Sequence, residues 1–77
     1  MYYSYVLRLV DGTYYIGFSG DLRNRVREHE SGRVKETKHK FPELVYYSAF
    51  KSKKKALDFE KYLKTNSGFA FRNKHLV

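Results

Sequence analysis

The feature that most constrains this fold is the stretch over residues 14–29, which predicts a strand, a turn and a helix in direct succession. Aromatic and β-branched side chains dominate its first part and favour a strand. Gly17 and Gly20 bracket the turn, where glycine tolerates conformations that other residues avoid. Either Ser19 or Asp21 can cap the helix that follows, because both carry a side-chain oxygen that can accept from free helical amides.

The helix predicted after this turn carries polar groups on its apolar side. Leu22 and Val26 form the apolar stripe, and at about 100° per residue Arg25 and His29 fall beside it, while Arg27 points outward. Burying two groups that can be cationic is costly unless a partner or ligand meets them. Either the long arginine stem carries its charge out to water, or the pair belongs to a site.

Length and charge narrow the class of protein. The 77 residues make one domain, 1–77, whose small core has no cysteine bridges, so 8 tyrosines and 6 phenylalanines must supply much of the buried area. A net charge of +8 favours a polyanionic partner, most simply nucleic acid, over a membrane surface. The chain lacks a leader-like start and any apolar run of about 20 residues, so we expect a cytoplasmic location without membrane contact.

Hydrophobic alternation and turn residues predict the order of the elements. Asp11-Gly12 is a hairpin turn, Gly32 ends the first helix, and Ser52 caps the second. Residues 33–40 are polar and basic, which predicts an exposed loop that is either merely solvated or in contact with phosphate. The predicted strands are 2–10, 13–18 and 43–50, and the predicted helices are 21–31, 52–65 and 69–75.

The register of the predicted hairpin decides which side chains share a face. A two-residue turn would place Tyr5 and Tyr15 on opposite faces of the sheet. A three-residue turn, with Gly12 in the left-handed conformation, would pair Leu9 with Thr13 and place both tyrosines on one face. The residues alone leave both registers open.

The helix predicted from Ser52 places a carboxylate on its apolar face. Ala56, Phe59 and Leu63 form that face, and Glu60 lies within it. A lone carboxylate there is expensive unless it is paired, protonated or bound to a metal. A salt bridge to an arginine of the first helix and a metal site are the competing interpretations.

The inward-pointing polar residues form a chemically coherent set. One carboxylate can hold a hard divalent cation such as Mg²⁺, with waters and a substrate phosphate completing the shell. An arginine suits phosphate, a histidine moves protons near neutral pH, and a tyrosine can orient or deprotonate water if a nearby cation lowers its pKa from about 10. The set comprises Tyr5, Tyr15, Arg25, His29 and Glu60. The isolated His39 and His75 are expected at the surface.

Short motifs in this order resemble the GIY-YIG nuclease superfamily. The resemblance is strongest to its small stand-alone bacterial members, whose domain is similar to the catalytic N-terminal domain of the excision-repair incision subunit. It covers essentially the whole chain, and the segments that carry it are Tyr3–Leu7, Tyr15–Gly17, Asp21-Leu22, Arg25 with His29, Thr37, Pro42, Leu44–Tyr47, Glu60–Lys64, Ser67-Gly68 and Ala70-Phe71. The resemblance implies an α+β fold in which helices flank a three-stranded antiparallel sheet, in the order β-β-α-β-α-α.

The resemblance also implies metal-dependent hydrolysis of phosphodiester bonds in DNA, with Mg²⁺ or Mn²⁺. Tyr5 and Tyr15 become the motif tyrosines, one of which activates or orients water, and the hairpin register that puts both on one face is then preferred. Arg25 becomes the phosphate-stabilising arginine, His29 its associated histidine, and Glu60 the metal ligand. Repair, recombination, mobile-element and defence roles all fit this activity.

The sequence departs from the family pattern at two positions and leaves one assignment open. Tyr3 stands where the first motif has glycine, and Phe18 stands where some members carry a polar or lysine residue that assists the base. Asn73 is the candidate for a late asparagine of the family, with Asn66 as a competitor.

A basic nucleic-acid-binding module with this fold and little turnover is the alternative function. A domain this small has no obvious reader of bases, so we expect recognition of DNA shape or backbone, such as branched or damaged DNA, or a protein partner that targets it. The residues expected to contact nucleic acid are Arg27, Lys35, Lys38, Lys40, Lys53, Lys54 and Asn73.

Overall fold

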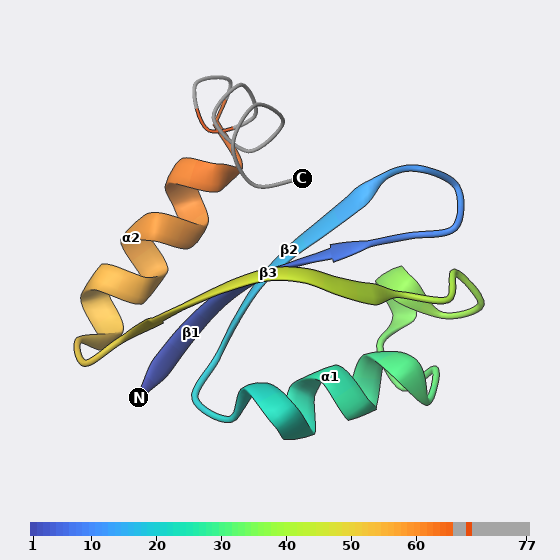
Figure 1. Ribbon diagram of the computed structural model, residues 1–77, viewed down its shortest axis with the longest axis horizontal. Coiled ribbons are helices and arrows are strands. Elements are labelled where there is room, and N and C mark those ends of the chain that lie inside the picture. The colour runs from blue at the N-terminus through green and yellow to red at the C-terminus, as the bar shows by residue number, and fades with distance from the viewer. Residues whose placement is uncertain (66–67, 69–77) are drawn as a thin grey trace.

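The structure is a computed structural model that describes residues 1–65 and Gly68 (Figure 1). Its sheet has the strand order β2-β1-β3 with both pairs antiparallel, which confirms the predicted α+β class. The helix predicted over 69–75 lies outside the described residues. The elements are β1 (Tyr2–Arg8), β2 (Tyr14–Ser19), α1 (Leu22–Glu30), a 3₁₀ turn η1 (Lys35–Thr37), β3 (Glu43–Phe50) and α2 (Lys53–Leu63).

The β1–β2 hairpin adopts the three-residue turn. The Leu9 amide donates to the Thr13 carbonyl over 2.8 Å, and Gly12 has a φ of 87°, a left-handed conformation that favours glycine. This register places Tyr5 and Tyr15 on the same face of the sheet, because each lies an even number of residues from the Leu9–Thr13 pair. The register preferred from the family resemblance is therefore confirmed.

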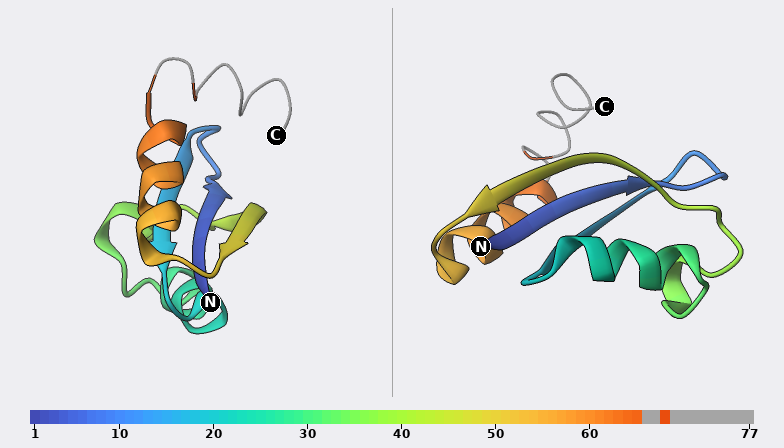
Figure 2. Two further views of the ribbon diagram at one scale, coloured as in Figure 1. Left: turned by 90° about the vertical axis from the view of Figure 1, so that its left-hand side faces the viewer. Right: turned by 60° about the horizontal axis from the view of Figure 1, so that its bottom comes forward.

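The two helices cover opposite faces of the sheet (Figure 2). Leu22 of α1 packs on one face, against the buried cluster that contains Tyr5 and Leu7. Leu63 and Phe59 of α2 pack on the other face, against a second cluster that contains Val6 and Ile16. Alternating residues of β1 thus feed two small cores, as the period of two in its sequence predicts.

The segment after α1 is only partly exposed, so its prediction as an exposed loop is wrong for two residues. Val34 and Thr37 are buried, with Thr37 fully inaccessible in η1. Val34 is apolar, and the Thr37 hydroxyl is drawn inward by a hydrogen bond to His29. Gly32, with a φ of 79°, follows the C-cap of α1 as predicted.

The predicted ends of several elements shift by one or two residues. β1 stops at Arg8 and not at residue 10, because the next residues form the turn. Asp21 and not Ser19 caps α1, since its carboxylate accepts from the Asn24 amide. α2 ends at Leu63. Within the part of the chain that the structure describes, no helix has the length and apolar character needed to cross a membrane.

Candidate active site

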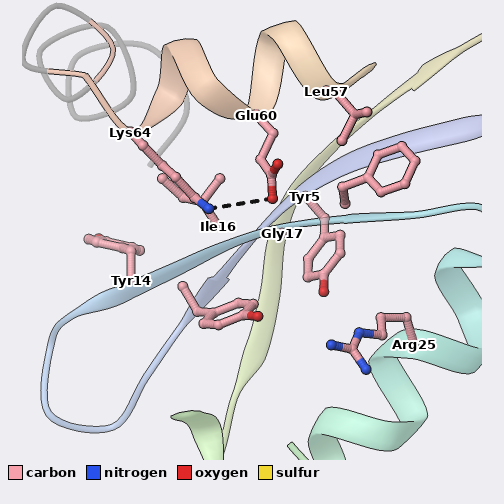
Figure 3. Close-up of a pocket in the computed structure, with 10 residues that line it drawn as sticks. Tyr5, Tyr14, Ile16, Gly17, Arg25, Leu57, Glu60 and Lys64 are labelled. Carbon is pink, nitrogen blue, oxygen red and sulfur yellow. Dashed lines mark hydrogen bonds and ion pairs between the residues drawn. The ribbon is translucent and has the colours of Figure 1, made fainter. Parts of the chain in front are cut away.

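A cleft of about 490 Å³ lies across the edge strand β2 and draws its lining from both helices (Figure 3). Four of the five predicted site residues line this cleft: Tyr5 from β1, Tyr15 from β2, Arg25 from α1 and Glu60 from α2. The fifth, His29, is buried beneath it and contacts both tyrosines. The structure therefore brings together residues that lie up to 55 positions apart in the sequence.

Gly17 leaves the space that the Tyr5 side chain occupies. The two residues are cross-strand partners, and a Cβ at Gly17 would collide with the Tyr5 ring and its hydroxyl. Only 1% of Tyr5 is exposed, so its ring has no free space into which it could move. Glycine is therefore required at position 17 for a steric reason, in addition to the turn conformation inferred from the sequence.

A chain of hydrogen bonds runs inward from the cleft. The Tyr5 hydroxyl lies 2.8 Å from His29 Nε2, and His29 Nδ1 lies 2.8 Å from Thr37 Oγ1. The Thr37 hydroxyl also lies 3.4 Å from the Val34 carbonyl, and when its proton is donated there Thr37 Oγ1 accepts from His29 Nδ1–H. This arrangement corresponds to the Nδ1–H tautomer of neutral His29, in which Nε2 accepts from the Tyr5 hydroxyl.

Burial keeps both partners of this pair neutral near pH 7. It raises the pKa of Tyr5 to about 12, an effect that interaction with the Arg25 guanidinium only partly offsets. Burial also lowers the pKa of His29 below its usual value, and the nearby Arg25 cation lowers it further. A neutral imidazole with a free Nε2 lone pair can accept the Tyr5 proton, which a protonated one could not.

Arg25 projects from α1 toward Tyr5 (Figure 3). Its Nη1 lies 3.4 Å from Glu28 Oε1, and about a third of its side chain is exposed. Burial by itself would lower the pKa of Arg25, but the interactions with Tyr5 and Glu28 outweigh it, so the net pKa is raised. The guanidinium is thus a fixed cation at the wall of the cleft, in a geometry that suits phosphate oxygens.

Glu60 enters the cleft from α2 with 18% of its side chain exposed. Its Oε2 lies 3.5 Å from Lys64 Nζ on the same helix, so the salt bridge to an arginine of the first helix is not found. Among the described residues there is no group of three or more His, Cys, Asp or Glu that could hold a metal ion. A single accessible carboxylate fits a Mg²⁺ ion that keeps most of its waters and binds substrate phosphate.

Tyr15 and Phe18 complete the aromatic wall of the cleft. The Tyr15 ring packs edge-on against His29, with centroids 4.9 Å apart, and lies 6.4 Å from Tyr5. Phe18 stacks on Tyr2 with centroids 6.2 Å apart, so the position that carries a polar residue in some family members is apolar here. Phe18 offers no amine that could assist a base.

The described residues that were predicted to contact nucleic acid lie outside the cleft, mostly on exposed surface. Lys40 has an ion-pair partner in Asp11, with Nζ 3.7 Å from Oδ2, and Lys54 has one in Asp58, at 2.9 Å. Arg27, Lys35, Lys38 and Lys53 are exposed, and Asn73 lies outside the described residues. Exposed His39 agrees with its prediction as a surface residue, while His75 falls beyond the described part.

Sequence reasoning assigned no role at the site to Thr37 or Lys64. The signal for Thr37 was the inward-facing His29 itself, since a buried imidazole needs a partner for each ring nitrogen. The signal for Lys64 was its position four residues after Glu60, where opposite charges meet on a helix.

Comparison with known proteins agrees with this architecture. Residues 1–74 match the family described as the GIY-YIG catalytic domain, so the chain belongs to the GIY-YIG family of nuclease domains. A UPF0213 protein of Streptococcus pneumoniae serotype 4 is 44% identical over 64 residues, which are 80% of this chain but only 65% of that protein's length.

Two further relatives support the assignment. The UPF0213 protein SpyM3_1077 of Streptococcus pyogenes serotype M3 is 41% identical over 80% of this chain and 70% of that protein. The solution NMR structure of a UPF0213 protein from Bacillus halodurans superposes with a TM-score of 0.60 at 32% identity, covering 96% of this chain and 82% of that one. This chain is therefore similar in sequence and fold to small UPF0213 proteins.

Proposed function

We propose that this chain is a metal-dependent endonuclease that hydrolyses phosphodiester bonds in DNA. The observation that carries the proposal is the convergence of Tyr5, Arg25 and Glu60 on one cleft, with the Tyr5 hydroxyl hydrogen-bonded to a neutral, buried His29. This arrangement supplies a route for a proton, a cation for a phosphate and a carboxylate for a metal. The net charge of +8 supports a polyanionic substrate.

In the proposed mechanism Tyr5 and His29 act together as the general base. The Tyr5 oxygen accepts a proton from the attacking water while the Tyr5 hydroxyl proton passes to His29 Nε2 over the existing 2.8 Å hydrogen bond. Tyr5 is then never an isolated phenolate, which its pKa of about 12 would disfavour. Thr37 keeps Nδ1–H in place, so Nε2 is always the accepting nitrogen.

Arg25 stabilises the charge that develops on the phosphoryl oxygens. Its guanidinium is already fixed beside Tyr5 and Glu28, so little reorganisation is needed when the substrate binds. Glu60 is the residue that would hold Mg²⁺ or Mn²⁺, and the bound ion would polarise the phosphoryl group and neutralise the leaving oxygen. Lys64 must release Glu60 for this to happen.

A cleavage assay with paired carboxylate variants tests the proposal. Supercoiled plasmid, single-stranded and branched DNA are incubated with Mg²⁺ or Mn²⁺ and with wild type, Glu60→Gln or Asp58→Asn. We expect Glu60→Gln to bind DNA but lose nicking, while Asp58→Asn keeps it, because Asp58 is exposed on the same helix and pairs only with Lys54 in the described chain. Nicking by Glu60→Gln at the wild-type rate would contradict the role of Glu60.

The choice of substrate in this assay also addresses the biological role. Preferential cleavage of branched DNA would support a repair or recombination role. Equal cleavage of intact plasmid would favour a role in mobile elements or defence.

A binding module with little turnover is the second candidate, and one observation favours it. The carboxylate of Glu60 is already paired with Lys64 at 3.5 Å, which offsets the charge a metal needs. Lys64→Met separates the two functions. If the protein is a nuclease, this variant should reach half-maximal nicking at a lower Mg²⁺ concentration. If neither protein cuts any of the DNAs while both bind them, the chain is a binding module.

A further inference from the structure

The loop between η1 and β3 holds a large aromatic side chain out of the protein. Phe41 is 79% exposed, more than any other large hydrophobic residue in the described part of the chain. Val10, 68% exposed, belongs to the hairpin turn whose backbone bonds to this loop. An exposed phenylalanine on so small a core is unexpected, because 77 residues have little apolar surface to spare.

The backbone of the loop fixes this exposed position. Phe41 has a φ of 49° and His39 a φ of 64°, the left-handed conformation that is unfavourable for residues with a side chain. Lys40 between them is anchored on both sides: its carbonyl accepts from the Val10 amide over 2.8 Å, and its amide donates to the Thr37 carbonyl over 3.1 Å. Strain of this kind persists only where surrounding contacts impose it.

The loop also lies beside the inner end of the hydrogen-bond chain that begins at the cleft. Phe41 borders a hollow of about 210 Å³ whose lining includes His29 and Thr37, the inner members of the hydrogen-bond chain. The anchor of the loop, Thr37, is therefore the same residue that fixes the tautomer of His29. A ligand at Phe41 would therefore lie at the C-terminal end of α1, next to His29, while Arg25 of the same helix lines the cleft.

The segment that leads to Phe41 is rich in basic residues. The segment 33–40 that leads to Phe41 contains four basic residues and one acidic residue, and the exposed Lys38 lines the same hollow as Phe41. A nucleic-acid strand offers the matching pattern, since each repeat presents an anionic phosphate and a flat aromatic base. A second copy of a chain with a charge of +8 would be repelled, and one ring with its valine neighbour is too small an apolar area for a membrane or a stable protein interface.

We propose that Phe41 is a stacking platform for an unpaired nucleobase of the bound DNA, with the loop cations holding the adjacent phosphates. The substrate class that follows is DNA with unpaired or easily unstacked bases, such as a bubble, flap or junction, in preference to continuous duplex. This inference rests on the proposed action on DNA, and it names the substrate of the same site.

The test measures stacking without cleavage. Bubble DNA carrying 5-iodouracil at its unpaired positions is bound in EDTA, irradiated with long-wavelength ultraviolet light, and the crosslinked residue is identified by mass spectrometry. We expect a crosslink at Phe41 that is retained in Phe41→Trp and lost in Phe41→Ala. Tyr47→Ala is the matched control, because Tyr47 is also an exposed aromatic residue, 54% accessible, but lies on β3.

Equilibrium binding gives the second readout. Phe41→Ala should weaken binding to bubble DNA by about ten-fold relative to duplex DNA, since stacking acts only on unpaired bases. An unchanged bubble-to-duplex ratio, or a crosslink elsewhere with none at Phe41, would overturn the inference. A concentration-dependent dimer abolished by Phe41→Ala would also overturn it, by showing that a second copy covers the ring.

The outcome is separable from that of the proposed nuclease function. A crosslink at Phe41 without any metal-dependent cleavage would leave the stacking platform standing and remove the nuclease. Cleavage that depends on Glu60 without a crosslink at Phe41 would do the reverse.

Discussion

Gly17 shows how a single missing side chain sets the geometry of the cleft. The fully buried Tyr5 ring lies across its backbone, in the space that a Cβ would fill. We expect Gly17→Ala to lower the free energy of unfolding by about 1–3 kcal/mol, the usual cost of overpacking, and to abolish nicking because the Tyr5 hydroxyl must leave His29 Nε2. Urea denaturation and the plasmid assay measure the two effects.

Gly20→Ala is the control for this substitution. Gly20 has open space around it and does not require a positive φ, so the change in unfolding free energy should stay within about 0.5 kcal/mol. Equal destabilisation by both variants would mean that backbone freedom, and not the Tyr5 contact, explains the need for Gly17.

Thr37 acts at the site through His29 and touches no substrate in the proposed mechanism. Thr37→Val keeps the shape but removes the oxygen that accepts from His29 Nδ1–H, leaving a buried donor without a partner. We expect a loss of about 1–3 kcal/mol in unfolding free energy and a shift of His29 away from the Nδ1–H tautomer, read from imidazole ¹⁵N chemical shifts.

Thr37→Ser distinguishes positioning from packing. It restores the hydroxyl without the methyl group, so the tautomer and the pH dependence of nicking should return to those of the wild type even if some stability stays lost. If Thr37→Val leaves the imidazole shifts unchanged, Thr37 does not control the tautomer.

At the scale of elements, α1 is the support for both Arg25 and His29, and its first turn depends on Asp21. The Asp21 carboxylate accepts from the Asn24 amide at 3.2 Å, which satisfies one of the free amides of the helix start. Asp21→Ala should lower the unfolding free energy by about 1 kcal/mol. Thermal or urea unfolding measures this loss, and hydrogen exchange should show that the first turn of α1 opens more often.

Asp21→Asn separates capping from charge. Asparagine keeps the accepting oxygen and removes only the favourable interaction with the helix dipole, so its effect should be a few tenths of a kcal/mol. A loss equal to that of Asp21→Ala would show that charge, and not the cap, holds this end of α1.

Local sequence signals determine most of these elements. Asp11-Gly12, Asp21, Gly32 and Ser52 each act within a few residues of their own position, so the hairpin, both helices and the third strand could be predicted within one or two residues. The alternation of side chains along β1 likewise divides its residues between the two cores. The hairpin register was not fixed by the residues, because both turns satisfy the same local pattern, and only the family resemblance favoured the correct one.

The segment between α1 and β3 was predicted less well because its structure depends on distant contacts. Thr37 is polar and is flanked by charged residues, yet it is buried, because His29 offers it a partner. The left-handed conformation at Phe41 depends on the hydrogen bond from the hairpin turn to Lys40. Neither contact produces a periodic pattern in the sequence from which it could be predicted.

At the scale of the whole molecule, the candidate site depends on its position at the edge of a narrow sheet. The helices lie on opposite faces of a three-stranded sheet, and Arg25 of one and Glu60 of the other both reach the cleft at the outer strand β2. A wider sheet would separate them. The sequence predicted that these residues face inward, but only the topology brings residues from opposite faces to one cleft.

The buried pair of Tyr5 and His29 makes the stability of the whole protein depend on pH. Folded His29 has a pKa below its usual value of about 6.5, so between these two values the unfolded chain binds more protons than the folded one. This contribution to stability is complete above about pH 6.5 and is lost as the pH falls toward the folded-state value. Folded Tyr5 has a pKa of about 12 against 10 when unfolded, so its contribution is complete below pH 10 and lost as the pH rises toward 12.

Stability should therefore form a plateau between about pH 7 and pH 10, and urea midpoints across the pH range measure it. Arg25 and Glu28 of α1, Glu36 of η1 and the two site tyrosines face His29, and Arg25 affects its pKa more than either carboxylate does. His29→Gln should flatten the slope below about pH 6.5. Tyr5→Phe should flatten the slope above pH 10. An acid slope that survives His29→Gln would show that the buried imidazole is not its source.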